Sequence, residues 1–258
     1  MRGDRAARDL RLAIPLKKTI AVLSALRRET RGLRCRLRPS DAAAPDGTLT
    51  VGRLGECEVI LGQSGVGPSR AAQLAERVLR QHSVEAVLSV GFAGALSPQL
   101  AIGELVLAER VRYRTPVACD PELMTRARRV VQTLALPYRA GLLISREALA
   151  GTLREKQGLF LHEGPVALDM ESGAVAEVVS KSGLPFLAVR SISDRFDQSL
   201  DPWLAELVGP EGSVRFARLL WGLLSRPPRI GSLLCLGRQT ALASGTLNRF
   251  LIGFLSTF

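Results

Sequence analysis

The stretch ALDMESGAVAEV, residues 167–178, joins a short apolar, strand-like run to a helix. The helical part continues to Gly183, and a glycine in that place typically ends a helix. The stretch is therefore one β–α unit. It places two carboxylates, Asp169 and Glu171, on either side of the thioether of Met170 at the junction between strand and helix.

Outward from this unit, strand and helix patterns alternate along the chain. Two helices carry start signals, Pro68 in the first turn of one and Asp120 as the cap of the other. The alternation predicts an α/β fold with a sheet covered on both faces. Apolar runs predict strands at 19–26, 84–94, 103–113, 138–145 and 184–194, with two short ones within 49–63, and helices are predicted at 68–82, 120–136, 172–183 and 214–225.

The composition is that of a folded protein of one large domain or two small ones. The chain has 258 residues, of which 47% are hydrophobic, and this excludes general disorder. No apolar run reaches the ~18 residues of a membrane-spanning helix, and the N-terminal run is too short for a signal peptide, so a cytoplasmic location is expected. Four scattered cysteines predict free thiols. His82 and His162 lack neighbouring ligands, so no metal and no cofactor is expected.

The net charge of +11 is concentrated at the two ends of the chain. Residues 1–38 carry twelve Lys and Arg against three acids, and residues 212–258 carry six Arg and no acid. Basic ends indicate an anionic partner. Because aromatic residues are only 5% of the chain, a membrane surface is favoured over nucleic acid, and no nucleic-acid partner is expected. A solvated basic surface without a partner stays open as the alternative.

Three acids stand where predicted strands end. Glu29 follows the first strand, Glu171 opens the helix after residue 170, and Asp194 ends the strand 184–194. Ligands of α/β sheets bind beyond the carboxyl ends of strands, so these acids are expected to converge on one edge. Each also has a structural interpretation: a solvated helix residue for Glu29, a helix N-terminal acid for Glu171 and a turn cap for Asp194. Asp169 is interpreted as a structural partner or cap.

Five segments resemble the nucleoside phosphorylase and nucleosidase superfamily in their order along the chain. They are SALRRE, SGVGPSRAA, VGFAGAL, ALDMESGAVAEV and LAVRSISD, and the resemblance covers roughly residues 19–222. It is strongest to the methylthioadenosine/S-adenosylhomocysteine nucleosidase branch. The resemblance implies a three-layer α/β/α fold with a central mixed, partly barrel-like sheet, a homodimer, and cleavage of the N-glycosidic bond of an adenine nucleoside.

The resemblance also implies roles for individual residues. Asp194 matches the acid that protonates N7 of the purine, and an Asp at this place implies adenine; partial burial beside other carboxylates is expected to raise its pKa. Glu171 matches the ribose-binding glutamate, Met170 packs on the sugar, and Glu29 activates water. The matching pocket positions are Ser145 and Leu149 for the purine, Phe92, Ala93 and Gly94 for the pocket wall, and Gly65 and Gly67 for the glycine turn.

The nucleophile, water or phosphate, is less firmly implied. Phosphorylases of this superfamily hold phosphate with an arginine and a hydroxyl, where this chain has Ser89 and Phe92. Charge-assisted hydrogen bonds contribute roughly 1.5 to 3 kcal/mol each, so their loss favours hydrolysis. Phosphate stays open as a partner, because Arg27, Arg28, Arg190 or Arg195 could form a different site.

The C-terminal segment has an amphipathic helical pattern. Its apolar positions are Leu247, Phe250, Leu251, Phe254, Leu255 and Phe258. Such a helix packs on the body of the protein or lies on a membrane surface, and both alternatives stay open. The expected organisation is a basic extension at 1–18, a nucleosidase-like domain at 19–226 and a basic amphipathic tail at 227–258.

The tail and the DMES and ISD segments are similar to hopanoid-associated phosphorylases. This similarity implies a lipid-linked substrate, adenosylhopane, cleaved to adenine and ribosylhopane, by an enzyme on the inner face of a membrane. The alternatives are a methylthioadenosine/S-adenosylhomocysteine-type nucleosidase, a purine nucleoside phosphorylase, and a non-enzymatic nucleoside-binding protein on the same fold.

Overall fold

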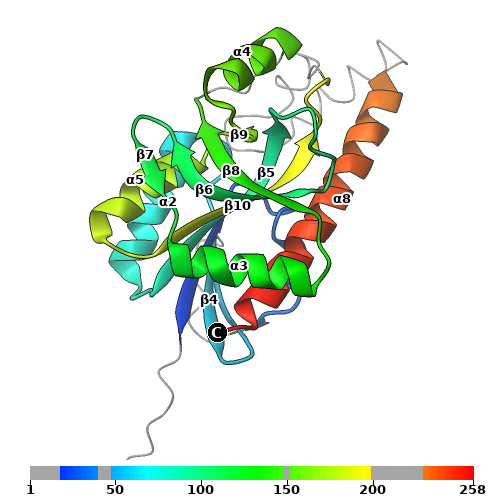
Figure 1. Ribbon diagram of the computed structural model, residues 1–258. Coiled ribbons are helices and arrows are strands. Elements are labelled where there is room, and N and C mark those ends of the chain that lie inside the picture. Colours follow the sequence, from blue (N-terminus) through cyan, green and yellow to red (C-terminus); the bar gives the residue numbers. More distant parts are fainter. Residues whose placement is uncertain (1–17, 40–47, 148–151, 199–228) are drawn as a thin grey trace, which may run out of the picture.

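The computed structural model describes residues 18–39, 48–147, 152–198 and 229–258, and helices surround a central sheet in it (Figure 1). The strands are β1 (Thr19–Ser24), β2 (Arg38–Pro39), β3 (Leu49–Leu54), β4 (Cys57–Gln63), β5 (Ala86–Ala95), β6 (Leu105–Arg112), β7 (Pro116–Ala118), β8 (Tyr138–Ser145), β9 (Ala167–Asp169) and β10 (Phe186–Asp194). The helices are α1 (Arg31–Arg34), α2 (Pro68–Gln81), α3 (Pro121–Thr133), α4 (Leu153–Glu163), α5 (Ser172–Ser182) and α8 (Arg229–Leu255).

The sheet is mixed and closes partly on itself. Its strand order is β10-β6-β8-β9-β5-β1-β4-β3-β2, and β10 also pairs with β5. This second pairing closes β10, β6, β8, β9 and β5 into a ring, while β1, β4, β3 and β2 extend from it as an open sheet. The predicted fold class, an α/β protein with a mixed, partly barrel-like sheet, is confirmed.

The strands at the centre of the sheet form because their sequences are apolar on both faces. In β1, every residue after Thr19 is buried, and β10 is buried along nearly its whole length. Helix α2 buries the apolar face predicted from its spacing, and Pro68 occupies its first turn. Asp120 accepts a hydrogen bond from the backbone N–H of Leu123 at 2.8 Å, which confirms the predicted cap of α3.

Helix α4 was not predicted, although its start carries a recognisable signal. Thr152 and Glu155 form a capping box, in which each side chain accepts a hydrogen bond from the backbone N–H of the other residue. The residues that follow have no clear apolar face, which is why periodicity does not reveal the helix. The helix predicted at 214–225 lies outside the described residues.

Three cysteines whose side chains are described are free thiols, as predicted. They are Cys35, Cys57 and Cys119. Burial raises the pKa of Cys57 and of Cys119 to about 12, so both stay protonated and unreactive at neutral pH. The side chain of Cys235 lies outside the described part of the chain.

Helix α8 packs on the body of the protein, and Figure 1 shows it running along the sheet. Leu247, Phe250, Leu251, Phe254 and Leu255 are each 0% exposed and belong to the main core. Their apolar face is therefore occupied by the protein and is not available to a membrane surface. Among the described helices, none combines the length and apolar character needed to cross a bilayer.

Candidate active site

The loop after β1 holds the carboxylate of Glu29 against strand β5. The side chain is buried, and its two oxygens accept hydrogen bonds from the backbone N–H groups of Phe92 at 3.0 Å and of Leu26 at 2.7 Å. A Cβ atom at Gly91 would lie 2.8 Å from Glu29 Oε1, so a residue with a side chain there would displace the carboxylate. Glycine at position 91 thus permits this close approach.

Asp194 reaches the same part of β5 from the neighbouring strand. It ends β10 opposite Gly94, where a Cβ atom would lie 2.8 Å from Asp194 Oδ2. Glu29 and Asp194 therefore contact positions 91 to 94 of one strand, although 165 positions separate them in the sequence. The structure places these two predicted site residues against the same short segment of β5, at the carboxyl ends of the parallel strands β1, β5 and β10.

Glu171 stands at the start of α5, next to the glycine turn. Its Oε1 accepts a hydrogen bond from the backbone N–H of Gly67 at 2.8 Å. Gly67 has φ 111°, which strongly favours glycine, and the turn aims its N–H at the carboxylate. Burial and the neighbouring charges of Asp169 and Glu29 raise the pKa of Glu171 to about 7, against the opposing effects of the Gly67 N–H and Arg190.

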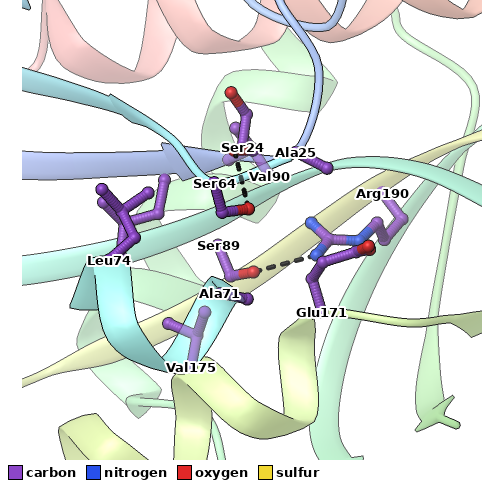
Figure 2. Close-up of a pocket in the computed structure, with 11 residues that line it drawn as sticks. Ser24, Ala25, Ser64, Ala71, Leu74, Ser89, Val90, Glu171, Val175 and Arg190 are labelled. Atoms are coloured by element: carbon purple, nitrogen blue, oxygen red, sulfur yellow. Dashed lines mark hydrogen bonds between the residues drawn. The ribbon is translucent and has the colours of Figure 1, made fainter. Parts of the chain in front are cut away.

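Asp169 and Arg190 form a fully buried ion pair beneath these residues. Arg190 Nε donates to Asp169 Oδ2 at 2.7 Å. Figure 2 shows the second bond of Arg190, which a terminal nitrogen donates to Ser89 Oγ at 2.9 Å. Asp169 accepts further hydrogen bonds from the hydroxyl of Ser145 and the backbone N–H of Ser172. Asp169 is thus the structural partner that the sequence predicted, and it orients Arg190.

Ser145 faces this ion pair. Its hydroxyl donates to Asp169 and accepts from the backbone N–H of Gly173 at 2.8 Å, so its donor and one of its two acceptor positions are engaged inside the protein. The other predicted purine residue, Leu149, lies outside the described residues.

A small cavity lies beside Glu171 and Arg190, as Figure 2 shows. Its volume of about 10 Å³ accommodates roughly one water molecule. Six of its eleven lining residues are apolar, and serines from three strands or strand ends line it together with Glu171 and Arg190. The polar lining residues are Ser24, Ser64, Ser89, Glu171 and Arg190.

Lys156 of α4 was missed by sequence reasoning and is the direct partner of Asp194. The residue is 1% exposed, and its ammonium group donates to Asp194 Oδ2 at 2.7 Å and to the carbonyl oxygens of Arg195 at 2.7 Å and Gln198 at 3.1 Å. The expectation that other carboxylates surround Asp194 is corrected here, because its ion-pair partner is a cation. The capping box would have revealed the helix, but no local pattern reveals this long-range pair.

The remaining pocket positions lie around these carboxylates. Phe92 is partly exposed, and the guanidinium of Arg28 lies 5.7 Å from the centre of its ring. Met170 is partly exposed beside Glu171, and Ala93 is buried between Phe92 and Gly94. Gly65 has φ 77° in the glycine turn.

The electrostatics of the site suit proton transfer near neutral pH. Burial raises the pKa of Glu29, while the N–H groups of Leu26 and Phe92 and the charge of Arg190 act against this rise. A carboxylate with a raised pKa is a more effective general base at neutral pH. Two carboxylates with raised pKa values and one paired with a buried ammonium group give the site distinct groups for accepting and donating protons.

A partly closed mixed sheet with buried carboxylates at its strand ends defines an α/β enzyme of acid–base type. A family model described as the phosphorylase superfamily matches residues 19–225, and the chain belongs to this family. The family predicted from the five sequence segments is thereby confirmed. The predicted enzyme class, a nucleosidase or a nucleoside phosphorylase, is also confirmed.

Individual relatives are nucleosidases. The chain is 25% identical over 195 residues to the 5'-methylthioadenosine/S-adenosylhomocysteine nucleosidase of Staphylococcus aureus, covering 68% of this chain and 86% of the relative. In fold it is similar to the nucleosidase of Neisseria meningitidis in complex with methylthio-immucillin-A, with a TM-score of 0.74, 19% identity, and 93% and 100% of the two chains covered. It is also similar to the futalosine hydrolase of Helicobacter pylori, with a TM-score of 0.73, 18% identity, and 94% and 99% covered.

The raised pKa of Glu171 predicts a pH-dependent stability. Because the pKa of about 7 in the folded chain exceeds the ordinary value of 4.5, folding favours the protonated form. The resulting stabilisation is full below about pH 4.5 and is lost as the pH rises through 7. Between pH 5 and 8 we expect the free energy of unfolding to fall by roughly 2 kcal/mol through this group, allowing for its partial exposure.

Urea unfolding of the wild type and of Glu171→Gln at pH 5 and pH 8 measures this contribution. The variant carries no titrating group at position 171, so its stability should fall by roughly 2 kcal/mol less over the same range. Equal pH dependence in the two proteins would contradict the raised pKa.

Proposed function

We propose that this protein hydrolyses the N-glycosidic bond of an adenine nucleoside. The observation that carries the proposal is that Glu29 and Asp194 both lie against positions 91 to 94 of β5, with Glu171 close enough to Glu29 for their charges to interact. Cleavage of this bond leaves positive charge on the sugar and negative charge on the departing base. The three carboxylates supply what each part of that transition state needs.

Asp194 is the proposed donor for the departing purine. Adenine leaves as an anion unless a proton reaches it, and Asp194, at the end of β10, delivers that proton to N7. Lys156 holds one oxygen of the carboxyl group and Ser193 Oγ donates to the other at 3.1 Å, so the group is fixed in orientation. In this pair the ammonium group of Lys156 supplies the proton, which passes through the carboxyl group of Asp194 to N7 and leaves Lys156 as a neutral amine.

Glu171 and Glu29 act on the sugar and on the nucleophile. Glu171 accepts hydrogen bonds from the ribose hydroxyls, and its negative charge stabilises the cationic sugar. Glu29 takes a proton from the attacking water as the new bond to the sugar carbon forms. Arg190, whose charge acts on both carboxylates, opposes the rise in their pKa values.

Water is the proposed nucleophile, because the groups around Arg190 are already engaged. Ser89, at the place of a phosphate-binding arginine in the phosphorylases, accepts a hydrogen bond from Arg190. Arg190 is paired with Asp169, and the cavity beside it accommodates roughly one water molecule. A phosphate ion would need a larger space and a cation that is free to bind it.

Adenine as the base is supported by Asp194 and by the similarity to 5'-methylthioadenosine/S-adenosylhomocysteine nucleosidases. For the substituent at the 5′ position of the ribose we propose a bulky apolar group, as in adenosylhopane. Two features support it: the similarity of the DMES and ISD segments to hopanoid-associated phosphorylases, and the partly exposed ring of Phe92 at the site.

A product assay tests the reaction and the substrate together. Purified protein is incubated with 5'-methylthioadenosine or with adenosylhopane in detergent, with and without phosphate, and adenine is quantified. Adenine and free ribosyl product in both buffers support hydrolysis, whereas a ribosyl phosphate formed only with phosphate would identify a phosphorylase. Release from methylthioadenosine but not from adenosylhopane would reject the lipid substrate, and tight nucleoside binding without release would favour a binding protein.

The Lys156→Met variant is expected to release adenine ~10 to 100 times more slowly than the wild type. The substitution removes the ammonium group that pairs with the buried carboxyl group of Asp194, so Asp194 loses its fixed orientation. A double-mutant cycle with Asp194→Asn measures the coupling. Because both residues act in one pair, the double variant should be no slower than Asp194→Asn alone; multiplied losses would show that Lys156 acts independently of Asp194.

A further inference from the structure

Helix α8 lies outside the residues that match the family, yet it contacts the loop that holds Glu29. The family match ends at residue 225, and α8 begins at Arg229. Helices α1 and α8 pack against each other directly after that loop. The contact is polar at its centre, although the face of α8 that surrounds it is apolar.

Asn248, a residue that is 6% exposed, makes the central contact. Its Nδ2 donates to the backbone carbonyl of Glu29 at 2.9 Å, and its Oδ1 accepts from the backbone N–H of Leu33 at 2.7 Å. Both ends of one amide group thus hold the backbone on either side of the turn into α1. The same Nδ2 donates to the carbonyl of Ser244 at 2.7 Å, which fixes the amide on its own helix.

Two further features hold the loop close to α8. Ser244 Oγ donates to the backbone carbonyl of Arg28 at 2.6 Å, so consecutive carbonyls at 28 and 29 are both bound by the helix. A Cβ atom at Gly32 would lie 2.9 Å from Cβ and Cγ of Asn248, so the glycine allows the backbone to approach the amide closely. The backbone of the loop is therefore held in place by specific contacts with α8.

We propose that Asn248 is a positioning residue for the general base Glu29, and that α8 is part of the catalytic unit. This inference rests on the proposed function. On one side of residue 29 the carboxylate is held by the N–H groups of Leu26 and Phe92, and on the other its backbone is held by Asn248. A displacement of about 1 Å in a catalytic group can slow a reaction ~100-fold, so the backbone contact is needed for water attack.

The test uses Asn248→Asp, which has the same shape. The variant keeps an acceptor for the Leu33 N–H but turns an oxygen toward the carbonyl of Glu29, so the two repel each other. We expect kcat for hydrolysis to fall ~10- to 100-fold while KM stays within about twofold. Azide is the diagnostic probe, because an anionic nucleophile needs no base: adenine release that depends on azide should stay close to that of the wild type.

Phe254→Leu is the matched control, since it weakens the packing of α8 in the core without touching the loop. It should leave the ratio of water to azide reaction unchanged. If Asn248→Asp folds poorly, Ser244→Ala is the second variant. It removes the contact to the carbonyl of Arg28 and the hydroxyl that accepts from Asn248 Nδ2 at 3.2 Å, and it should show the same ratio change with a smaller loss.

Three results would overturn the inference. In the first, Asn248→Asp hydrolyses as fast as Phe254→Leu. In the second, its water and azide reactions fall together, which indicates a general structural defect. In the third, wild-type protein releases no adenine from any adenine nucleoside; this removes the proposed function as well, whereas the first two remove the role of Asn248 alone.

Discussion

Asp194→Asn is expected to lower kcat for adenine release by ~10²-fold or more, with the largest loss on substrates whose base departs as a poor leaving group. Asparagine keeps the shape of the side chain beside Gly94 and can still form a hydrogen bond to N7. It cannot deliver a proton, so the purine must leave as an anion. The measurement is single-turnover release of adenine, which separates chemistry from product release.

A riboside with a nitrophenolate leaving group distinguishes lost acid catalysis from a damaged site. This base leaves without a proton, so Asp194→Asn should cleave it at nearly the rate of the wild type. Asp197→Asn is the matched control. Asp197 lies three residues after Asp194 and forms an exposed ion pair with Arg195, so its substitution should not change the rate. Adenine release by Asp194→Asn within threefold of the wild type would contradict the role of Asp194 as the acid.

Glu29→Ala is expected to slow hydrolysis ~10²- to 10³-fold, because the attacking water loses its base. Substrate binding should weaken much less, since the proposed contacts of the purine and the ribose lie with Asp194 and Glu171. Added azide should restore adenine release and yield a ribosyl azide, because this nucleophile has no proton to lose. The adenine and the sugar product are quantified with increasing azide.

Failure of azide to restore release in Glu29→Ala would point to another role for this residue. A loss of binding as large as the loss of rate would mean that Glu29 holds substrate. Retention of full hydrolysis would mean that a different group activates water, and the cavity beside Arg190 would then be the place to search for it.

Much of the fold was predictable because buried strands appear in the sequence as continuous apolar runs. The apolar runs at β1, β5, β8 and β10 and the spacing in α2 and α3 predicted those elements closely. Helix α4 escaped because its residues lack an apolar face, so only its capping box marks it. The pattern of α8 predicted an amphipathic helix, but a pattern does not specify what covers the apolar face, which here is the protein core.

The candidate site was predictable only where motifs in sequence order carry the information. Glu29, Glu171 and Asp194 were selected at the ends of predicted strands, and the closure of β10 onto β5 brings two of them to one strand segment. Lys156 and Asn248 could not be found in this way, since each reaches its partner across a long separation in the sequence. Such pairs depend on tertiary packing and have no local signature.

A crystal structure of the chain with methylthio-immucillin-A bound tests most directly whether three carboxylates surround one nucleoside. The expected result places Asp194 within about 3 Å of the nitrogen or carbon at the N7 position of the base, Glu171 on the sugar hydroxyls, and Glu29 on the face of the sugar opposite the base. An inhibitor bound away from Gly91 to Gly94 would contradict the proposed site. So would a complex in which any of the three carboxylates contacts neither the inhibitor nor a water molecule placed for attack.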